Sequence, residues 1–133
     1  MSALPDAAAW RGAAGRFGGL FEPLDAGARV GLIARANPAS MLLWEVGAQG
    51  VAARVAPFPG FASCGVDMLL SADPDSMDRI LDAVDGDLFA ALRADIRQGG
   101  VVCYMLRRRC DLEARGFEDL LEALGFAFMG ACR

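Results

Sequence analysis

The spacing of apolar residues divides the chain into helical and extended segments. Over residues 5–21, large side chains such as Trp10, Phe17 and Phe21 recur at helical separations, which predicts a helix. Several glycines in the second half of this segment weaken the helix there. A Pro- and Gly-containing turn over residues 23–27 then leads into the extended part of the chain.

Three extended segments follow the first helix. Residues 28–36, 40–46 and 51–57 are rich in apolar and β-branched side chains, as strands are. The second and third are separated by Gly-Ala-Gln-Gly at residues 47–50, which is turn chemistry and predicts a hairpin. Residues 57–65 form a loop that contains Phe58 and Phe61. We favour the interpretation that these two rings fill the core over the alternative that they gate a ligand.

A fourth strand over residues 66–71 runs into two helices. Ser71 or Asp73 is expected to cap the first helix, with Pro74 in its first turn. The second helix is expected to begin at Asp87 and to end before the two glycines at 99 and 100.

Four carboxylates lie at the start of the first of these helices, and they have two interpretations. Asp73, Asp75, Asp78 and Asp82 could form an acidic site, but no base or metal partner is evident beside them. Carboxylates are expected near a helix N-terminus because they stabilise its dipole. We therefore favour a structural role for them.

The last third of the chain begins with a continuous apolar run at residues 101–106. Such a run predicts a central strand that is buried on both faces. Arg107 to Arg109 follow it, and a solvated strand end is favoured over an anion site or a site for an acidic partner. Residues 117–125 predict a helix, and a short strand is expected after it.

These elements predict one α+β domain over residues 1–133. Its sheet is expected to be mainly antiparallel, with five or six strands covered by helices. Residues 1–28 would supply an N-terminal helix and turn, and residues 110–133 a C-terminal helix and short strand.

Composition narrows the class of protein. Hydrophobic residues make up 55% of the 133 residues and charged residues 23%, so the chain can bury a large core. A bilayer span needs roughly 20 apolar residues, and no run approaches that length. The first residues lack the features of a secretory signal, so a cytoplasmic location is expected. The formal net charge of −4 argues against a nucleic-acid partner.

Missing residue types exclude several kinds of chemistry within the chain. It contains no histidine, lysine or threonine, which removes histidine-dependent hydrolysis, Schiff-base catalysis and the lysine-containing phosphate loop. The four cysteines are widely scattered and form no CxxC pair, so neither a zinc cluster nor a disulfide framework is expected. We accordingly predict no metal, no cofactor and no catalytic residue.

The order of elements after the hairpin resembles the sterol carrier protein type two family. The resemblance covers about residues 29–106 and rests on "VDMLLSADPDSM" followed by "ILDAVDGDLFAALRADIRQGG" and a strand. It implies an α+β domain that encloses an apolar tunnel for fatty acyl chains or sterols and has no catalytic residues. The long tail from Cys110 departs from the family pattern, which puts the tunnel mouth in doubt. The family also usually has a cleaner glycine-aspartate step before the fifth strand than "RQGGVV".

A second resemblance points to a different class. "LLEALGFAFMG" is similar to the closing helix and strand of Gnat-type N-acetyltransferases, and "GAQGVA" resembles their pyrophosphate loop. That loop must open a helix whose amides hold phosphate. Here the alternating segment "VAARV" and two prolines follow instead, which favours a strand.

Three functions follow, in order of preference. The first is non-catalytic binding of a hydrophobic small molecule or lipid, such as a fatty acid. An acyl-coenzyme A dependent acyltransferase is second, and a protein-interaction subunit third; a homodimer is also left open. The candidate ligand-binding residues are Trp44, Phe58, Phe61, Met68, Phe89 and Tyr104, although each is more simply explained as ordinary core.

Overall fold

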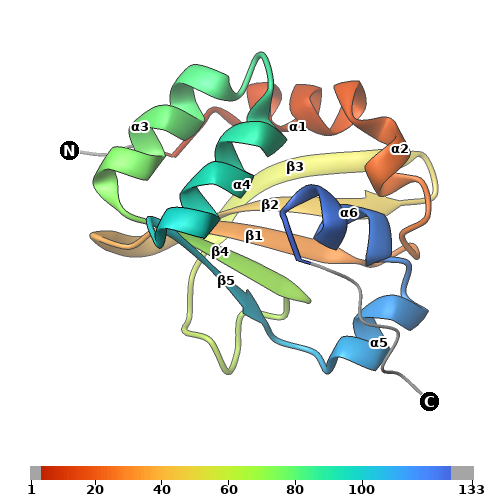
Figure 1. Cartoon of the computed structure of the whole chain (residues 1–133). Helices are drawn as coiled ribbons and strands as arrows, with labels where there is room; N and C mark the ends of the chain where they lie inside the picture. The colour runs from red at the N-terminus through yellow and green to blue at the C-terminus, as the bar shows by residue number, and fades with distance from the viewer. Residues whose placement is uncertain (1–3, 127–133) are drawn as a thin grey trace.

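A five-stranded sheet forms the centre of the protein, and helices cover one of its faces. The computed structural model describes residues 4–126. Its strands are β1 (Arg29–Ala34), β2 (Asn37–Gly47), β3 (Gly50–Pro57), β4 (Met68–Ala72) and β5 (Val101–Met105). Its helices are α1 (Ala7–Arg16), α2 (Gly18–Phe21), α3 (Pro74–Ala83), α4 (Leu88–Gln98), α5 (Arg109–Ala114) and α6 (Glu118–Ala123). Figure 1 shows α1 to α4 above the sheet, α5 at its lower right, and the segment between β3 and β4 below it.

The strand order is β3-β2-β1-β4-β5, and most neighbours are antiparallel. Of the described strands, only β1 and β4 are parallel neighbours, because the segment between β3 and β4 crosses the sheet to the other side of β1 and β4 then runs in the same direction as β1. This confirms the expected α+β class with a mainly antiparallel sheet. Gly31 in β1 permits close packing of its neighbours, since a Cβ at this position would lie 2.8 Å from Met41 Sδ and 2.9 Å from Leu69 Cδ1.

The main core lies between the sheet and the helices. Trp10 of α1 stacks on Trp44 of β2 with ring centroids 3.9 Å apart, and both rings are buried. The Trp44 indole N–H donates to the Trp10 carbonyl oxygen at 2.7 Å, so the contact is polar as well as apolar. Phe21 packs edge-on against Trp44, and Phe89 stacks on Trp44. The aromatic cluster therefore ties α1, α2 and α4 to the sheet.

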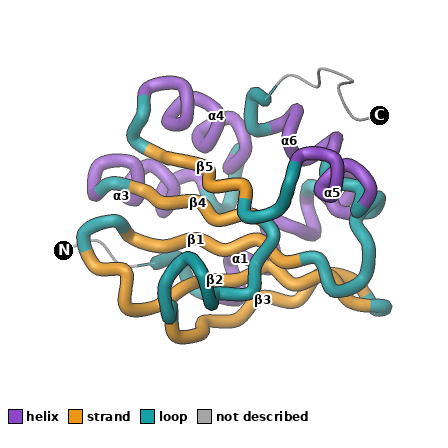
Figure 2. Tube along the Cα trace, turned by 90° about the horizontal axis from the view of Figure 1, so that it is seen from below, coloured by secondary structure: helices purple, strands orange, loops and turns teal. Residues whose placement is uncertain are grey.

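A smaller core lies on the opposite face of the sheet. Figure 2 shows the segment between β3 and β4 crossing this face. Ile33, Met41, Leu43 and Leu69 form the smaller core together with Val66. The two phenylalanines of the segment between β3 and β4 differ in whether they pack against this core. Phe58 packs against this core as expected, whereas Phe61 is 46% exposed and does not fill it.

Strand β5 lies at the edge of the sheet and not, as the sequence predicts, at its centre. Residues 101–106 were expected to form a central strand buried on both faces, but β5 is the edge strand of the sheet. Its exposed fraction alternates along the strand, and Val102 and Tyr104 are 37% and 39% exposed. The apolar run does not show the alternation because both of its exposed positions are themselves apolar.

Two helical segments also differ from expectation. The predicted helix over residues 5–21 is divided into α1 and α2 at Phe17, whose backbone leaves the helical region. Helix α5 was not predicted, because Arg107 to Arg109 indicated only a solvated strand end. The predicted helix over residues 117–125 is present as α6. The short strand expected after it lies mostly outside the described residues.

Among residues 4–126, no helix is long and apolar enough to span a bilayer.

Candidate functional site

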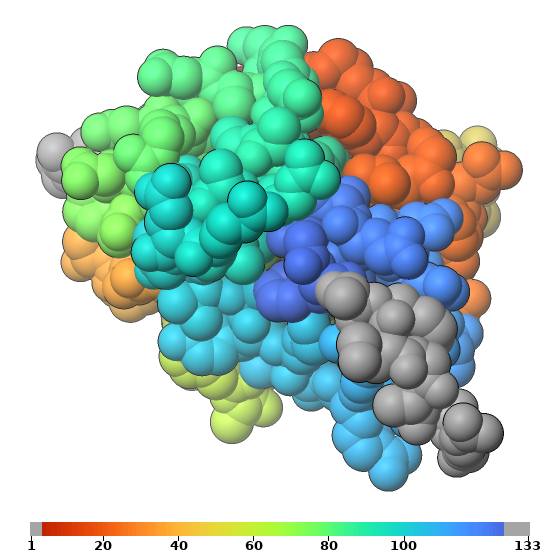
Figure 3. Space-filling view, viewed as in Figure 1, coloured from red at the N-terminus to blue at the C-terminus, as the bar shows by residue number. Residues whose placement is uncertain are grey.

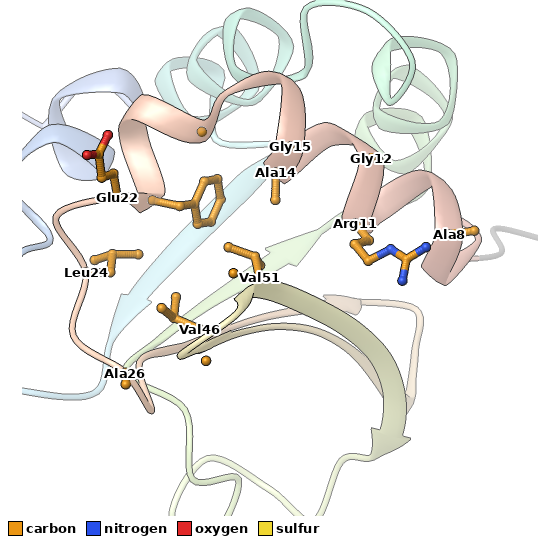
Figure 4. A pocket seen from close by; sticks show the side chains of 14 residues that line it. Ala8, Arg11, Gly12, Ala14, Gly15, Glu22, Leu24, Ala26, Val46 and Val51 are labelled. Atoms are coloured by element: carbon orange, nitrogen blue, oxygen red, sulfur yellow. The ribbon is translucent and has the colours of Figure 1, made fainter.

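A pocket opens between the first two helices and the end of the β2–β3 hairpin. Its volume is about 560 Å³. Figure 4 shows Leu24, Val46 and Val51 in the space below α1, and Ala14 above them. The pocket is lined by Ala8, Arg11, Gly12, Ala14, Gly15, Gly18, Phe21, Glu22, Leu24, Ala26, Val46, Gly47, Gly50 and Val51.

Small residues on one side of α1 leave room for this pocket. Ala8, Gly12 and Gly15 follow one another at intervals of three or four, so they lie on the same side of the helix. A Cβ built on Gly12 or Gly15 meets no heavy atom within 4 Å. Larger residues at these positions would project into the space between α1 and β3.

The floor of the pocket is apolar and continuous with the main core. Phe21 and Leu24 are buried core residues that also line the pocket. Val46 and Val51 face each other across the β2–β3 register and are partly buried. An apolar ligand in the pocket would contact these side chains and would remove them from water.

Two charged residues flank this apolar surface. Arg11 of α1 and Glu22 after α2 stand at opposite ends of the pocket in Figure 4. Neither is within ion-pair distance of the other's charged group, and both residues are exposed. A second depression, lined by Arg11, Glu45 and the β2–β3 turn, adjoins the pocket and shares its hairpin residues.

The six residues predicted to bind a ligand do not lie together. Trp44, Met68 and Phe89 are buried in the main core on the helix-covered face. Phe58, Phe61 and Tyr104 lie on the other face, where their rings contact in sequence at centroid distances of 5.4 and 4.8 Å. None of the six lines the pocket at α1. Their role in ligand binding stays a prediction.

The pocket residues were missed because the sequence signal for them is weak. In the sequence, the glycines of α1 and α2 predict only a weakened helix, since a glycine in a helix costs about 1 kcal/mol. Their three-residue spacing at Gly12, Gly15 and Gly18 is the one feature that could have indicated an open helix face. The contribution of the hairpin end depends on tertiary structure, which the local pattern does not contain.

Of the four carboxylates of α3, Asp73 has a structural role. Asp73 is the N-cap of α3 and accepts a hydrogen bond from the Ser76 backbone N–H at 2.8 Å. Hydrogen bonds from the Ser76 backbone and then from its hydroxyl lower the pKa of Asp73 below the ordinary value of 3.8. Asp75, Asp78 and Asp82 are exposed. The structural interpretation of these three residues stays a prediction.

Arg107 is engaged by a buried carboxylate. Asp67 is 2% exposed, and its Oδ1 accepts a hydrogen bond from Arg107 Nε at 2.9 Å, while Arg115 Nε lies 3.4 Å away. Its Oδ2 accepts the backbone N–H of Arg29 at 2.9 Å. Arg108 pairs with Asp111 at 3.1 Å on the surface. The contacts of Asp67 join the end of β5 and the residue after α5 to the start of β1.

The cysteines do not form a reactive or metal-binding site in the described part of the chain. Burial raises the pKa of the Cys103 thiol to about 12, so it is a poor nucleophile at neutral pH. Cys64 is also a free thiol. Cys110 is disulfide-bonded, which corrects the expectation that no disulfide forms. Over residues 4–126, no cluster of three or more cysteine and carboxylate residues could hold a metal ion.

Comparison with known proteins adds no relative: no protein-family model matches the chain, and no curated protein is significantly similar to it.

Proposed function

We propose that this chain binds a hydrophobic small molecule or lipid, without catalysing a reaction, in the pocket beside α1. The proposal rests on an apolar pocket of about 560 Å³. Its two charged lining residues, Arg11 and Glu22, lie at opposite ends. This volume falls in the usual range for small-molecule sites, roughly 300–1,000 Å³. Burying about 300 Å² of ligand surface would contribute about 7 kcal/mol before the costs of ordering.

The resemblance to the sterol carrier protein type two family supports the same proposal. It implies a strand, two helices and a further strand after the hairpin, and the chain has β4, α3, α4 and β5 in that order. We therefore propose membership of that family together with binding of an acyl chain or sterol. A cytoplasmic location stays a prediction, and the disulfide at Cys110 weighs against it because such bonds are rare in reducing compartments.

Filling the pocket tests the proposed function. Gly15→Leu places an isobutyl group in space that is empty of protein atoms, so it should weaken binding of a fluorescent fatty acid by at least about tenfold while leaving the protein folded. The matched control is Gly19→Leu, because Gly19 is also an unobstructed helical glycine but does not line the pocket.

Affinity is measured by titration, and native mass spectrometry shows whether a lipid copurifies with the protein. If the wild type binds neither the fluorescent fatty acid nor any copurified lipid, the proposed function is wrong. If Gly15→Leu and Gly19→Leu bind as well as the wild type, the ligand does not occupy this pocket.

A further inference from the structure

The outer edge of β5 presents unpaired backbone groups. The Leu106 N–H donates to the Asp67 carbonyl, and the Asp73 N–H donates to the Gly100 carbonyl. Even-numbered residues of this segment therefore bond to β4. Because bonding directions alternate in an antiparallel pair, the N–H and C=O groups of Val101, Cys103 and Met105 point away from the sheet. Within residues 4–126, no other strand or loop supplies a backbone hydrogen-bond partner for these groups.

The strand that carries this edge lies at the surface. Figure 3 shows the cyan segment around residues 100–106 below α4, uncovered by any other described segment over much of its length. Two of its side chains add apolar area beside the edge: Val102 and Tyr104 are 37% and 39% exposed on the face away from the helices. The Phe61 ring packs against Tyr104 at 4.8 Å and extends this apolar surface.

The two edges of the sheet differ in how they are protected. On β3, Arg54 lies mid-strand and Pro57 ends the strand, and both features discourage the pairing of a further strand. Strand β5 has the sequence Val-Val-Cys-Tyr-Met, with no charge and no proline. Of the two edge strands in residues 4–126, β5 is therefore the one with an unprotected, pairing-competent edge.

Charges at the ends of β5 indicate which kind of strand fits. Arg97 is exposed in the last turn of α4, shortly before β5. Arg107 follows β5, and it shares the single carboxylate of Asp67 with Arg115, which leaves one excess positive charge at this end; Arg108 is already paired with Asp111. A second copy paired antiparallel through β5 would bring Arg107 toward the partner's end that carries Arg97, which is unfavourable. An extended segment with acidic residues at its ends has no such conflict.

We propose that the β5 edge binds an extended peptide of another protein as a sixth strand. Alternate apolar side chains of the peptide would pack beside Val102 and Tyr104, and acidic residues at its ends would lie near the flanking arginines. Backbone hydrogen bonds to Val101, Cys103 and Met105 would supply the pairing, as in other cases of strand addition. This surface is separate from the ligand pocket, which lies at the other edge of the sheet beside β3.

The probe for this proposal is a fluorescein-labelled peptide with the sequence Asp-Val-Thr-Val-Thr-Val-Glu. Fluorescence anisotropy with the full-length protein should show saturable binding. The same peptide with lysine at both ends should bind at least about tenfold more weakly. Val102→Lys places a charge on the edge strand and should also weaken binding by at least about tenfold. Val55→Lys is the matched control, because Val55 is 53% exposed on the opposite edge strand.

Amide hydrogen exchange shows where the peptide binds. Peptide addition should slow exchange at Val101, Cys103 and Met105, and the melting temperatures of the two lysine variants should establish that both remain folded. The proposal is overturned if the acidic peptide does not bind, or if exchange at these three amides is unchanged. Equal loss of binding in Val102→Lys and Val55→Lys would also overturn it. So would a wild-type dimer that Val102→Lys dissociates, because the edge would then serve a second copy.

Discussion

At the scale of single residues, Asp67 is the clearest case of a polar group held for structure. Its carboxylate is almost fully buried and is compensated by two arginine side chains and one backbone N–H. A buried charge without such partners is strongly destabilising. The three partners come from β1, from the end of β5 and from the α5–α6 junction, so one side chain joins segments far apart in sequence.

Removing this charge should destabilise the fold. Asp67→Asn keeps the shape of the side chain but leaves Arg107 and Arg115 without their carboxylate, and we expect a loss of about 2 kcal/mol in the free energy of unfolding. Asp111→Asn is the control, because its partner Arg108 is 86% exposed, and it should change stability by no more than about 0.5 kcal/mol. Urea denaturation measures both. Equal effects of the two substitutions would mean that burial at Asp67 does not matter.

At the scale of elements, local sequence signals identified most helices and strands but not their surroundings. Proline, a capping aspartate and glycine fix where α3 and α4 begin and end, and these signals act within a few residues. The edge position of β5 has no comparable signal, because Val102 and Tyr104 are apolar although they are exposed. Helix α5 was missed because two arginines precede it, a third is its first residue, and Leu112 is its only buried residue.

The cap of α3 makes a pH-dependent contribution to stability. Hydrogen bonds from Ser76 lower the pKa of Asp73 in the folded state. The stabilisation is therefore fully present above the unfolded value, near 3.8, and is lost as pH falls through the still lower folded pKa. Asp73→Asn can accept the same backbone hydrogen bond but does not titrate.

This difference can be measured directly. Wild type should be more stable than Asp73→Asn at neutral pH, and the gap should narrow as the pH is lowered below about 4. Thermal unfolding of both proteins across this range gives the comparison. If the difference in stability between wild type and Asp73→Asn stays constant as the pH is lowered, the charge of Asp73 does not stabilise α3.

At the scale of the whole molecule, the candidate site and the strand order depend on contacts that local patterns do not encode. The pocket needs α1, the segment after α2 and the tip of the β2–β3 hairpin, which are brought together only by folding. The expected ligand residues were chosen because they are large and apolar. Four of them, Trp44, Met68, Phe89 and Phe58, pack in or against the two cores, whereas small residues of α1 leave the space for the pocket.

The main core also determines how the molecule should unfold. Residues of α1, α2, α3, α4, α5 and α6 share this core with the sheet, so removing one end of the chain would expose buried surface in the rest. We therefore expect one cooperative transition, in agreement with the predicted single domain. The stacked Trp10 and Trp44 report on the α1–β2 contact through fluorescence, while far-ultraviolet circular dichroism reports on all helices. The two denaturation curves should coincide. If the fluorescence transition comes at a lower urea concentration, the N-terminal helix unfolds as a separate unit and the single-domain prediction is wrong.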